Sequence, residues 1–116
     1  MHIHQIRVIR VPIFANMSQQ LSPEQLEKIA KQFGTPVYVY HAERIKEQYD
    51  KLLTAFDGVD TKFFYAAKAL TNISILKYIL SIGCNIDCSS INEVKLALKA
   101  GFEPQNILIY IKQHCV

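Results

Sequence analysis

The sequence predicts an α/β fold in which a parallel sheet is built from repeated strand-helix-strand units. Apolar segments with strand character begin at Thr61, Asn85 and Asn106, roughly 21 to 24 residues apart, and a helical pattern fills each gap. Parallel strands joined by right-handed crossover helices have this spacing. Periodicity alone does not separate the two folds that such units can begin, a doubly wound sheet and a barrel.

The composition is that of a packed globular chain. Of the 116 residues, 50% are hydrophobic and 20% are charged, and there are four Gly and four Pro. The net charge of +3 comes from 13 basic and 10 acidic side chains, which are spread along the sequence without a Lys/Arg cluster. We therefore expect no nucleic-acid partner, and a nucleic-acid-binding function, which would rest on the charge alone, ranks last.

Cysteine usage and hydropathy predict a cytoplasmic protein without a metal site. The three cysteines are an odd number, and neither they nor the four histidines have the spacing of a zinc site, so we expect reduced thiols. The apolar stretch near the start, residues 3–14, is interrupted by His4, Arg7 and Arg10. A membrane span needs roughly 18 uninterrupted apolar residues, so we expect no membrane association.

The first part of the chain is expected to contain a leader and one capped helix. Residues 1–16 resemble nothing that follows and are interpreted as an atypical leader, with the domain beginning at residue 17. In Ser22-Pro-Glu-Gln25 the serine is a predicted N-cap, the proline a first helical residue, and the glutamine the partner in a capping box. An amphipathic helix follows, and Gly34 ends it.

A strand, a helix and a second strand are predicted next. Residues 37–40, Val-Tyr-Val-Tyr, have high strand propensity, and apolar side chains recur at helical intervals between Ile45 and Phe56. Asp57-Gly58 is a turn pair that ends this helix. It leads into residues 61–68, an apolar run that predicts a buried strand.

Two further helices and strands complete the predicted pattern. Asn72 is the expected cap of a helix that ends before Gly83, and residues 85–89 form the next strand. A helix over residues 90–100 and a strand over residues 106–111 follow. Only about five residues remain after that strand, whereas a closed barrel needs about 250. We therefore expect an incomplete, truncated fold.

Lys68 is the main candidate for chemistry. It closes the apolar run of residues 61–68, at the strand end where barrel enzymes carry their reacting groups. A lysine that is partly removed from water loses its preference for the charged form, and its amine can then condense with an aldehyde to form a Schiff base. The alternative is a lysine that reaches from the strand end into water and has no catalytic role.

Four motifs in register carry a family resemblance. Phe64-Tyr-Ala-Ala-Lys-Ala-Leu-Thr-Asn72 resembles the Tyr-Ala-x-Lys-Ala strand of the pyridoxal-phosphate-dependent decarboxylases that act on ornithine, lysine, arginine and diaminopimelate. Gly34-Thr-Pro-Val-Tyr-Val-Tyr40 looks like the opening segment of the diaminopimelate decarboxylases in this family. Ile75-Leu-Lys with Gly83, and then Asp87-x-x-Ser-x-x-Glu93, keep the family's order and spacing. The resemblance is nearly continuous over residues 21–108.

The resemblance implies both a fold and a reaction. The fold is the alanine-racemase-like (β/α)8 TIM-like barrel, PLP fold type III, of which residues 17–116 would be an incomplete N-terminal portion without the second, mostly β domain. The cofactor would be pyridoxal 5'-phosphate, with Lys68 as the catalytic and cofactor-binding lysine and Asp87 and Glu93 as further cofactor-binding residues. The implied reaction converts a small amino-acid substrate, meso-2,6-diaminopimelate, to L-lysine, and the implied full-length assembly is a homodimer.

Some residues have a plainer interpretation, and one segment departs from the family. Ser90-x-x-Glu93 is also a capping box, and Asp87 would also suit the end of a strand. Tyr65 is the aromatic residue for which cofactor stacking is the main alternative to core packing. After Ile107-Leu108 the relatives usually read Phe/Tyr-Thr-Pro-Asn, which this chain lacks, so we expect the chain alone to be inactive.

Two other functions are kept as alternatives. An ornithine or arginine decarboxylase is the second enzyme candidate, although Gly34-Thr-Pro36 and the Lys-Ala-Leu-Thr-Asn string favour diaminopimelate. From a different class, the chain would be a noncatalytic remnant or a binding module that pairs with a full-length relative. The open edges of a three-stranded sheet favour such association.

Overall fold

The computed structural model describes residues 21–110, and it divides into two compact units at the bond between Asp57 and Gly58. The leader predicted for residues 1–16 and the end of the strand predicted for residues 106–111 lie outside the described residues. No helix in the described part of the chain is long and apolar enough to cross a membrane.

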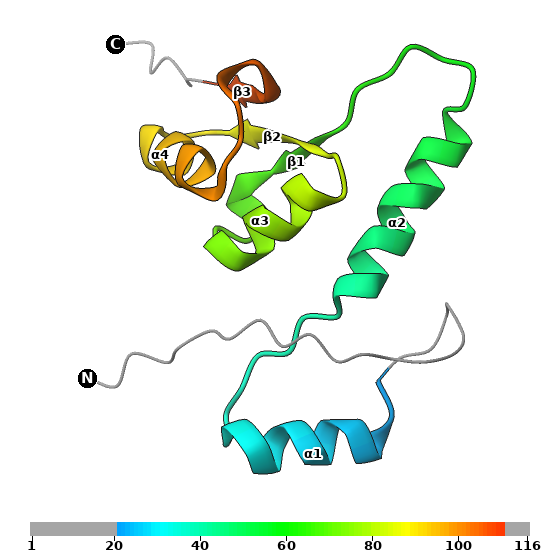
Figure 1. Cartoon of the computed structure of the whole chain (residues 1–116), viewed down its shortest axis with the longest axis vertical. Helices are drawn as coiled ribbons and strands as arrows, with labels where there is room; N and C mark the ends of the chain where they lie inside the picture. Colours follow the sequence, from blue (N-terminus) through cyan, green and yellow to red (C-terminus); the bar gives the residue numbers. More distant parts are fainter. Residues whose placement is uncertain (1–20, 111–116) are drawn as a thin grey trace, which may run out of the picture. The chain divides into compact units, whose positions relative to one another are not determined.

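The first unit contains helix α1 (Pro23–Phe33; Figure 1), and this helix has the predicted caps. The Ser22 hydroxyl accepts a hydrogen bond from the Gln25 amide at 3.3 Å, and the Gln25 side chain accepts one from the Ser22 amide at 2.8 Å. This reciprocal pair satisfies two amides that have no partner inside the helix. The helix ends at Gly34, which has φ +80° and donates to the Ala30 carbonyl.

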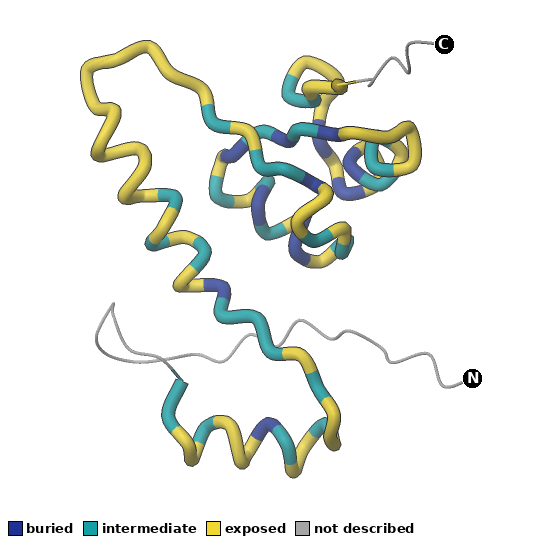
Figure 2. The backbone as a smooth tube through the Cα atoms, turned by 180° about the vertical axis from the view of Figure 1, so that it is seen from behind, coloured by how far each residue is buried: buried dark blue, intermediate teal, exposed yellow. Residues whose placement is uncertain are grey.

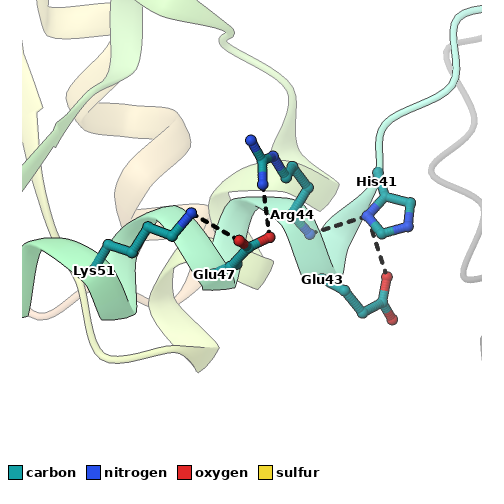
Figure 3. A network of polar contacts seen from close by, with 5 residues as sticks. All are labelled: His41, Glu43, Arg44, Glu47 and Lys51. Atoms are coloured by element: carbon teal, nitrogen blue, oxygen red, sulfur yellow. Dashed lines mark hydrogen bonds and ion pairs between the residues drawn. The ribbon is translucent and has the colours of Figure 1, made fainter. Parts of the chain in front are cut away.

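Helix α2 (Ala42–Ala55) begins at a residue that the sequence did not single out as a cap. Nδ1 of His41 accepts a hydrogen bond from the Arg44 amide at 3.0 Å, so the imidazole acts as the N-cap. Further along the helix, Glu47 lies 2.8 Å from both Arg44 and Lys51 (Figure 3). Hydrogen bonds, first from Lys51 and then from Arg44, hold the pKa of Glu47 below its usual value.

The strand predicted for residues 37–40 is wrong. These residues have no regular secondary structure, and Tyr38 is 69% exposed. Strand propensity measures how well side chains fit a pleated surface beside a neighbouring strand. Within residues 21–110, the three strands that pair belong to the second unit, and none of them pairs with residues 37–40.

The second unit confirms the predicted parallel sheet. Strands β1 (Phe64–Ala66), β2 (Asn85–Cys88) and β3 (Ile107–Ile109) lie in the order β1-β2-β3, and both pairs are parallel. Helix α3 (Ile73–Ser81) connects the first two strands and helix α4 (Ile91–Ala100) the last two (Figure 1). The two helices pack against each other. The unit therefore consists of two successive crossover units.

The strands are shorter than the sequence predicts. The run over residues 61–68 pairs only from Phe64 to Ala66 and then turns into a single 3-10 turn, η1 (Ala67–Ala69). The last strand begins at Ile107, because a second 3-10 turn, η2 (Pro104–Asn106), precedes it. Strand β1 ends one residue before β2 does, because the chain turns into η1 at Ala67.

The buried residues of this unit lie on the sheet and on the two helices, and Figure 2 shows the buried stretches of the chain in dark blue. Ile86 and Cys88 of β2 are fully buried, as are Leu76 of α3 and Ala97 of α4. Since successive strand residues point to opposite faces, Asp87 points away from this core, and it is only partly buried. Complete burial of a side chain such as Ile86 contributes about 1.5–3 kcal/mol to folding.

The two helices of the second unit have the predicted ends. The Asn72 side chain accepts hydrogen bonds from the amides of Ser74 and Ile75 at 2.9 and 3.3 Å. After α4, Gly101 adopts the left-handed conformation with φ +106°, which L-residues rarely take. A Cβ at this position would lie 3.3 Å from Cδ2 of Leu80, so both backbone conformation and space favour glycine.

Candidate functional site

The candidate residues gather at the carboxyl edge of the sheet. Because all three strands are parallel, the segments that follow them emerge at one edge, where open α/β sheets and barrels place their ligands. The turn η1, which carries Lys68, follows β1 at this edge and contacts β2. Asp87 lies near the end of β2, and Glu93 lies in the first turn of α4.

Lys68 lies one step beyond its predicted position. It occupies the centre of η1 and not the end of a strand, and its side chain is exposed. The prediction was a lysine partly removed from water, but the described residues leave this amine exposed to solvent. What the structure provides instead is a defined place for the lysine, directly after β1 at the carboxyl edge.

Two side-chain hydroxyls brace the turn that carries Lys68. Oη of Tyr65 donates to the carbonyl of Leu70 at 3.2 Å, and Oγ1 of Thr71 donates to the carbonyl of Ala67 at 2.9 Å. Ala67 itself is fully buried. Tyr65 thus forms a hydrogen bond to the backbone beyond the turn. This role is neither of the two predicted for Tyr65, core packing and cofactor stacking.

Asp87 carries an unsatisfied oxygen. It pairs in register with Ala66 of β1 and Leu108 of β3, on the face of the sheet opposite to Ile86 and Cys88. Within the described residues its Oδ1 is buried and has no hydrogen-bond partner. An unpaired buried acceptor costs about 1–3 kcal/mol and is uncommon in native proteins. A strand end without a ligand gives no reason for this arrangement, whereas a polar group bound at the edge would supply a donor.

Glu93 has the capping role that the Ser90-x-x-Glu93 pattern predicts, with one difference in the partner. The Ser90 hydroxyl accepts from the Glu93 amide at 3.2 Å, but the carboxylate reaches Ser89 and not the Ser90 amide. Oε2 of Glu93 lies 2.6 Å from the Ser89 nitrogen and 3.0 Å from the Ser89 hydroxyl. The carboxylate is therefore fixed beside the end of β2. Its negative charge also interacts favourably with the N-terminal, positive end of the α4 dipole.

The thiol of Cys88 is influenced by both carboxylates, and the sequence analysis predicted no role for it. Burial raises the pKa of its thiol, and the negative charges of Glu93 and then Asp87 raise it further. Both carboxylates are thus close enough to act on one atom at the end of β2. The thiol remains protonated near neutral pH, so Cys88 is unsuited to act as a nucleophile. The sequence signal for its burial was the alternation of polar and apolar residues in Asn85-Ile-Asp-Cys88.

The described side chains at this edge suit an organic ligand. Among residues 21–110 there is no group of three or more His, Cys, Asp or Glu residues that could bind a metal. The edge instead combines an exposed primary amine, Lys68, with the acceptor oxygens of Asp87 and Glu93. An aldehyde-bearing cofactor with hydrogen-bond donors fits this donor and acceptor set.

These observations define a class of protein: a parallel α/β domain whose first strand leads into a lysine-bearing turn at the ligand-binding edge. Comparison with known families is more specific. A family profile described as "Pyridoxal-dependent decarboxylase, pyridoxal binding domain" matches residues 42–115. The chain belongs to this family, and the resemblance inferred from the sequence motifs is confirmed.

Curated relatives with similar sequences are named diaminopimelate decarboxylases. That of Methanothermobacter thermautotrophicus is 42% identical over 83 residues, which cover 70% of this chain and 19% of the relative. That of Campylobacter jejuni is 39% identical over 82 residues, 71% of this chain and 20% of the relative. The chain therefore spans about a fifth of the length of these relatives.

Solved structures show the same fold. The diaminopimelate decarboxylase of Helicobacter pylori, an I148L mutant complexed with L-lysine, matches with a TM-score of 0.67 and 36% identity over 72% of this chain and 21% of that protein. A lysine/ornithine decarboxylase of Vibrio vulnificus, complexed with putrescine, matches with a TM-score of 0.68 and 26% identity over 76% of this chain and 24% of that protein. The described fold therefore corresponds to part of a pyridoxal-dependent decarboxylase.

Proposed function

We propose that this chain supplies the cofactor-attachment segment of a pyridoxal-phosphate-dependent decarboxylase that converts meso-2,6-diaminopimelate to L-lysine. The observation that carries the proposal is the position of Lys68. It lies on a braced turn at the carboxyl edge of a parallel sheet, inside the segment matched by the pyridoxal-binding family. The match to the Tyr-Ala-x-Lys-Ala pattern supports the same residue.

In this proposal Lys68 has two roles. Its Nζ holds the cofactor covalently, and after the substrate amine has displaced it, the freed amine moves a proton at the substrate carbon that loses its carboxylate. Bound pyridoxal phosphate would supply an electron-withdrawing ring that accepts the electron pair released with carbon dioxide. Because Lys68 is exposed, its amine is accessible both to the cofactor and to the substrate amine that displaces it.

Asp87 and Glu93 are proposed to line the cofactor pocket beside β2. The unpartnered Oδ1 of Asp87 supports a role as an acceptor for a donor group on the ligand. One carboxylate oxygen of Glu93, Oε2, accepts hydrogen bonds from the Ser89 amide and hydroxyl, and the other, Oε1, is the proposed acceptor for the ligand. Their combined effect on the pKa of Cys88 supports a shared acidic environment.

The names of the relatives favour diaminopimelate as the substrate. The curated diaminopimelate decarboxylases that match are 34–42% identical and a solved one is 30% identical, whereas the lysine/ornithine enzyme is 26% identical. The second candidate, an ornithine or arginine decarboxylase, is supported by the fold match to that enzyme, but its TM-score of 0.68 does not separate it from the 0.67 of the diaminopimelate enzyme. We also propose that the whole protein is cytoplasmic, as the buried thiols of Cys84 and Cys88, which form no disulfide, support, and that it is a homodimer, as the family resemblance implies.

The attachment site is tested by reductive trapping. The purified chain is mixed with pyridoxal phosphate, its absorbance is recorded, and the adduct is reduced with borohydride and located by peptide mapping. We expect the adduct on Lys68 and its loss in Lys68→Ala, while Lys77→Ala, a change at another exposed lysine, leaves it intact. Labelling that is spread over many lysines and unaffected by Lys68→Ala would contradict the proposal.

The substrate is tested in a chimaera. Residues 42–110 of this chain replace the matching segment of the Campylobacter jejuni diaminopimelate decarboxylase, and release of carbon dioxide is measured with meso-diaminopimelate and with ornithine. We expect activity on diaminopimelate that is abolished by Lys68→Ala. A folded chimaera that is inactive on diaminopimelate but active on ornithine would favour the second candidate.

A further inference from the structure

The turn that carries Lys68 is held by contacts that cross it. The turn η1 has no side-chain cap of its own, and its flanking residues Ala66 and Leu70 have extended backbones. A single 3-10 turn has poor hydrogen-bond geometry and is easily remodelled. Two side-chain hydroxyls supply what the turn lacks, and they belong to residues outside it, Tyr65 before and Thr71 after.

The two hydrogen bonds close the turn from opposite sides. The Tyr65 hydroxyl, on strand β1, reaches forward to the carbonyl of Leu70, and the Thr71 hydroxyl reaches back to the carbonyl of Ala67. The bonded carbonyls therefore flank Lys68: Ala67 directly precedes it in the chain, and Leu70 follows two residues after it. Together they fix the backbone on both sides of the lysine while its side chain remains exposed.

The surroundings anchor this brace to the rest of the unit. Ala67 is fully buried and η1 contacts β2, so the carbonyl that Thr71 bonds belongs to a fixed residue. Directly after Thr71, the Asn72 side chain caps α3 through the amides of Ser74 and Ile75. The turn is thus joined to the sheet at one end and to a capped helix at the other.

We propose that Tyr65 and Thr71 are positioning residues that act through the carbonyls of Leu70 and Ala67 to hold Lys68 for reaction with an aldehyde. This inference rests on the proposed function and adds to it two side chains that need not touch the cofactor. In the reaction, Nζ of Lys68 adds to the aldehyde carbon and the carbonyl oxygen leaves as one water, so a C=N bond replaces the C=O bond. A fixed backbone limits the arc that Nζ searches before this step.

The test compares trapping rates at individual lysines in the full chain. Tyr65→Phe and Thr71→Val each remove one hydroxyl and keep the shape of the side chain. Each is expected to slow pyridoxal phosphate trapping at Lys68 by about two- to tenfold, the range that corresponds to one net hydrogen bond. Trapping at Lys62 and Lys77, two exposed lysines in the same unit, is expected to stay unchanged.

Matched variants separate positioning from a general loss of structure. Thr71→Ser keeps the hydroxyl and is expected to restore the rate at Lys68, while Tyr38→Phe, at a tyrosine that is 69% exposed, is expected to have no effect. Amide hydrogen exchange provides a second measurement that does not depend on the cofactor. Tyr65→Phe is expected to speed exchange in residues 68–71 and to leave α4 unchanged.

The possible outcomes distinguish this inference from the function on which it rests. Selective labelling of Lys68 in the wild type that persists unchanged in Tyr65→Phe and Thr71→Val overturns the positioning role alone. A wild-type chain without selective labelling overturns both the role and the proposed function. Slower labelling at all three lysines together with faster exchange in α4 means that the hydroxyls only stabilise the fold, and this too overturns the positioning role.

Discussion

The two units of the chain are stabilised by different kinds of interaction. In the first unit, α1 and α2 have capped ends and pairs of charged side chains along their exposed surfaces, such as Glu27 with Lys31, and among its described residues only Ile29 and Ala42 are buried. In the second unit, strands and helices that are distant in sequence enclose a fully buried core. Local signals therefore define the first unit, and burial defines the second.

This difference determines which substitutions matter in each unit. A capping residue acts on its own helix, and exposed ion pairs contribute little because water screens them. A core residue such as Ile86 contacts several elements at once, so its removal weakens the whole unit. Four substitutions or titrations, from the largest expected effect to the smallest, would test this contrast.

Ile86→Ala should have the largest effect. Ile86 is 0% exposed at the centre of the sheet, and truncation of a buried isoleucine costs about 2–5 kcal/mol in the free energy of unfolding. Denaturant unfolding followed by circular dichroism measures the loss. Leu98→Ala, at a leucine of α4 that is 47% exposed, serves as the control and should cost much less. Equal effects of the two changes would show that burial does not define the second unit.

Ser22→Ala should have a smaller effect that is confined to α1. It removes the acceptor of the Gln25 amide, and loss of an N-cap costs about 0.5–2 kcal/mol. Backbone chemical shifts should show fraying of the first turn of α1 without change in α3 or α4. Gln25→Ala, which removes the other half of the capping box, should fray the same turn. Shift changes throughout the second unit would contradict local control.

The pH dependence of unfolding should reveal Cys88 in the second unit. Its pKa is raised in the folded state, so the folded protein binds the thiol proton more tightly than the unfolded chain does. The resulting stability is complete below the ordinary thiol pKa and is lost as the pH rises through the folded value. Unfolding free energies measured between neutral and alkaline pH should therefore fall, and Cys88→Ala should flatten the decline. A decline that Cys88→Ala leaves unchanged would contradict this assignment.

Glu47 should give the smallest effect. Its pKa is lowered in the folded state, so its contribution to stability is present above the ordinary carboxyl pKa and is lost as the pH falls through the folded value. The Glu47 side chain is partly exposed and its two partners are more than half exposed, so salt should reduce the shift. Titration by NMR should show that Lys51→Ala raises the pKa of Glu47 more than Arg44→Ala does. A pKa that is insensitive to both changes would remove the ion pairs from the account of α2.

The sequence predicted the helices more accurately than the strands, for a physical reason. Helix ends depend on nearby residues, so Ser22, Gly34, Asn72 and Ser90 could be identified as caps from local patterns. The extent of a strand depends on its partner. Residues 37–40 have the composition of a strand but no partner strand among the described residues, and the strand predicted for residues 61–68 pairs with β2 only from Phe64 to Ala66.

The candidate site was predictable in its residues but not in its geometry. The motif around Lys68 identified the lysine, yet placing it on a 3-10 turn required knowing where β1 stops pairing. The capping pattern predicted one bond of Glu93 correctly but not its reach to Ser89. The unsatisfied oxygen of Asp87 depends on the arrangement of two neighbouring strands, which no local pattern encodes.

The strand order has a consequence for the growth of this polypeptide during synthesis. Each strand pairs with the strand that precedes it in the chain, so β2 can join β1 as soon as residues up to Cys88 have been made. β3 then adds to an existing ladder, and neither pairing waits for a distant segment. Folding can therefore follow translation from the N-terminus onward, with each new crossover using the previous one as its template.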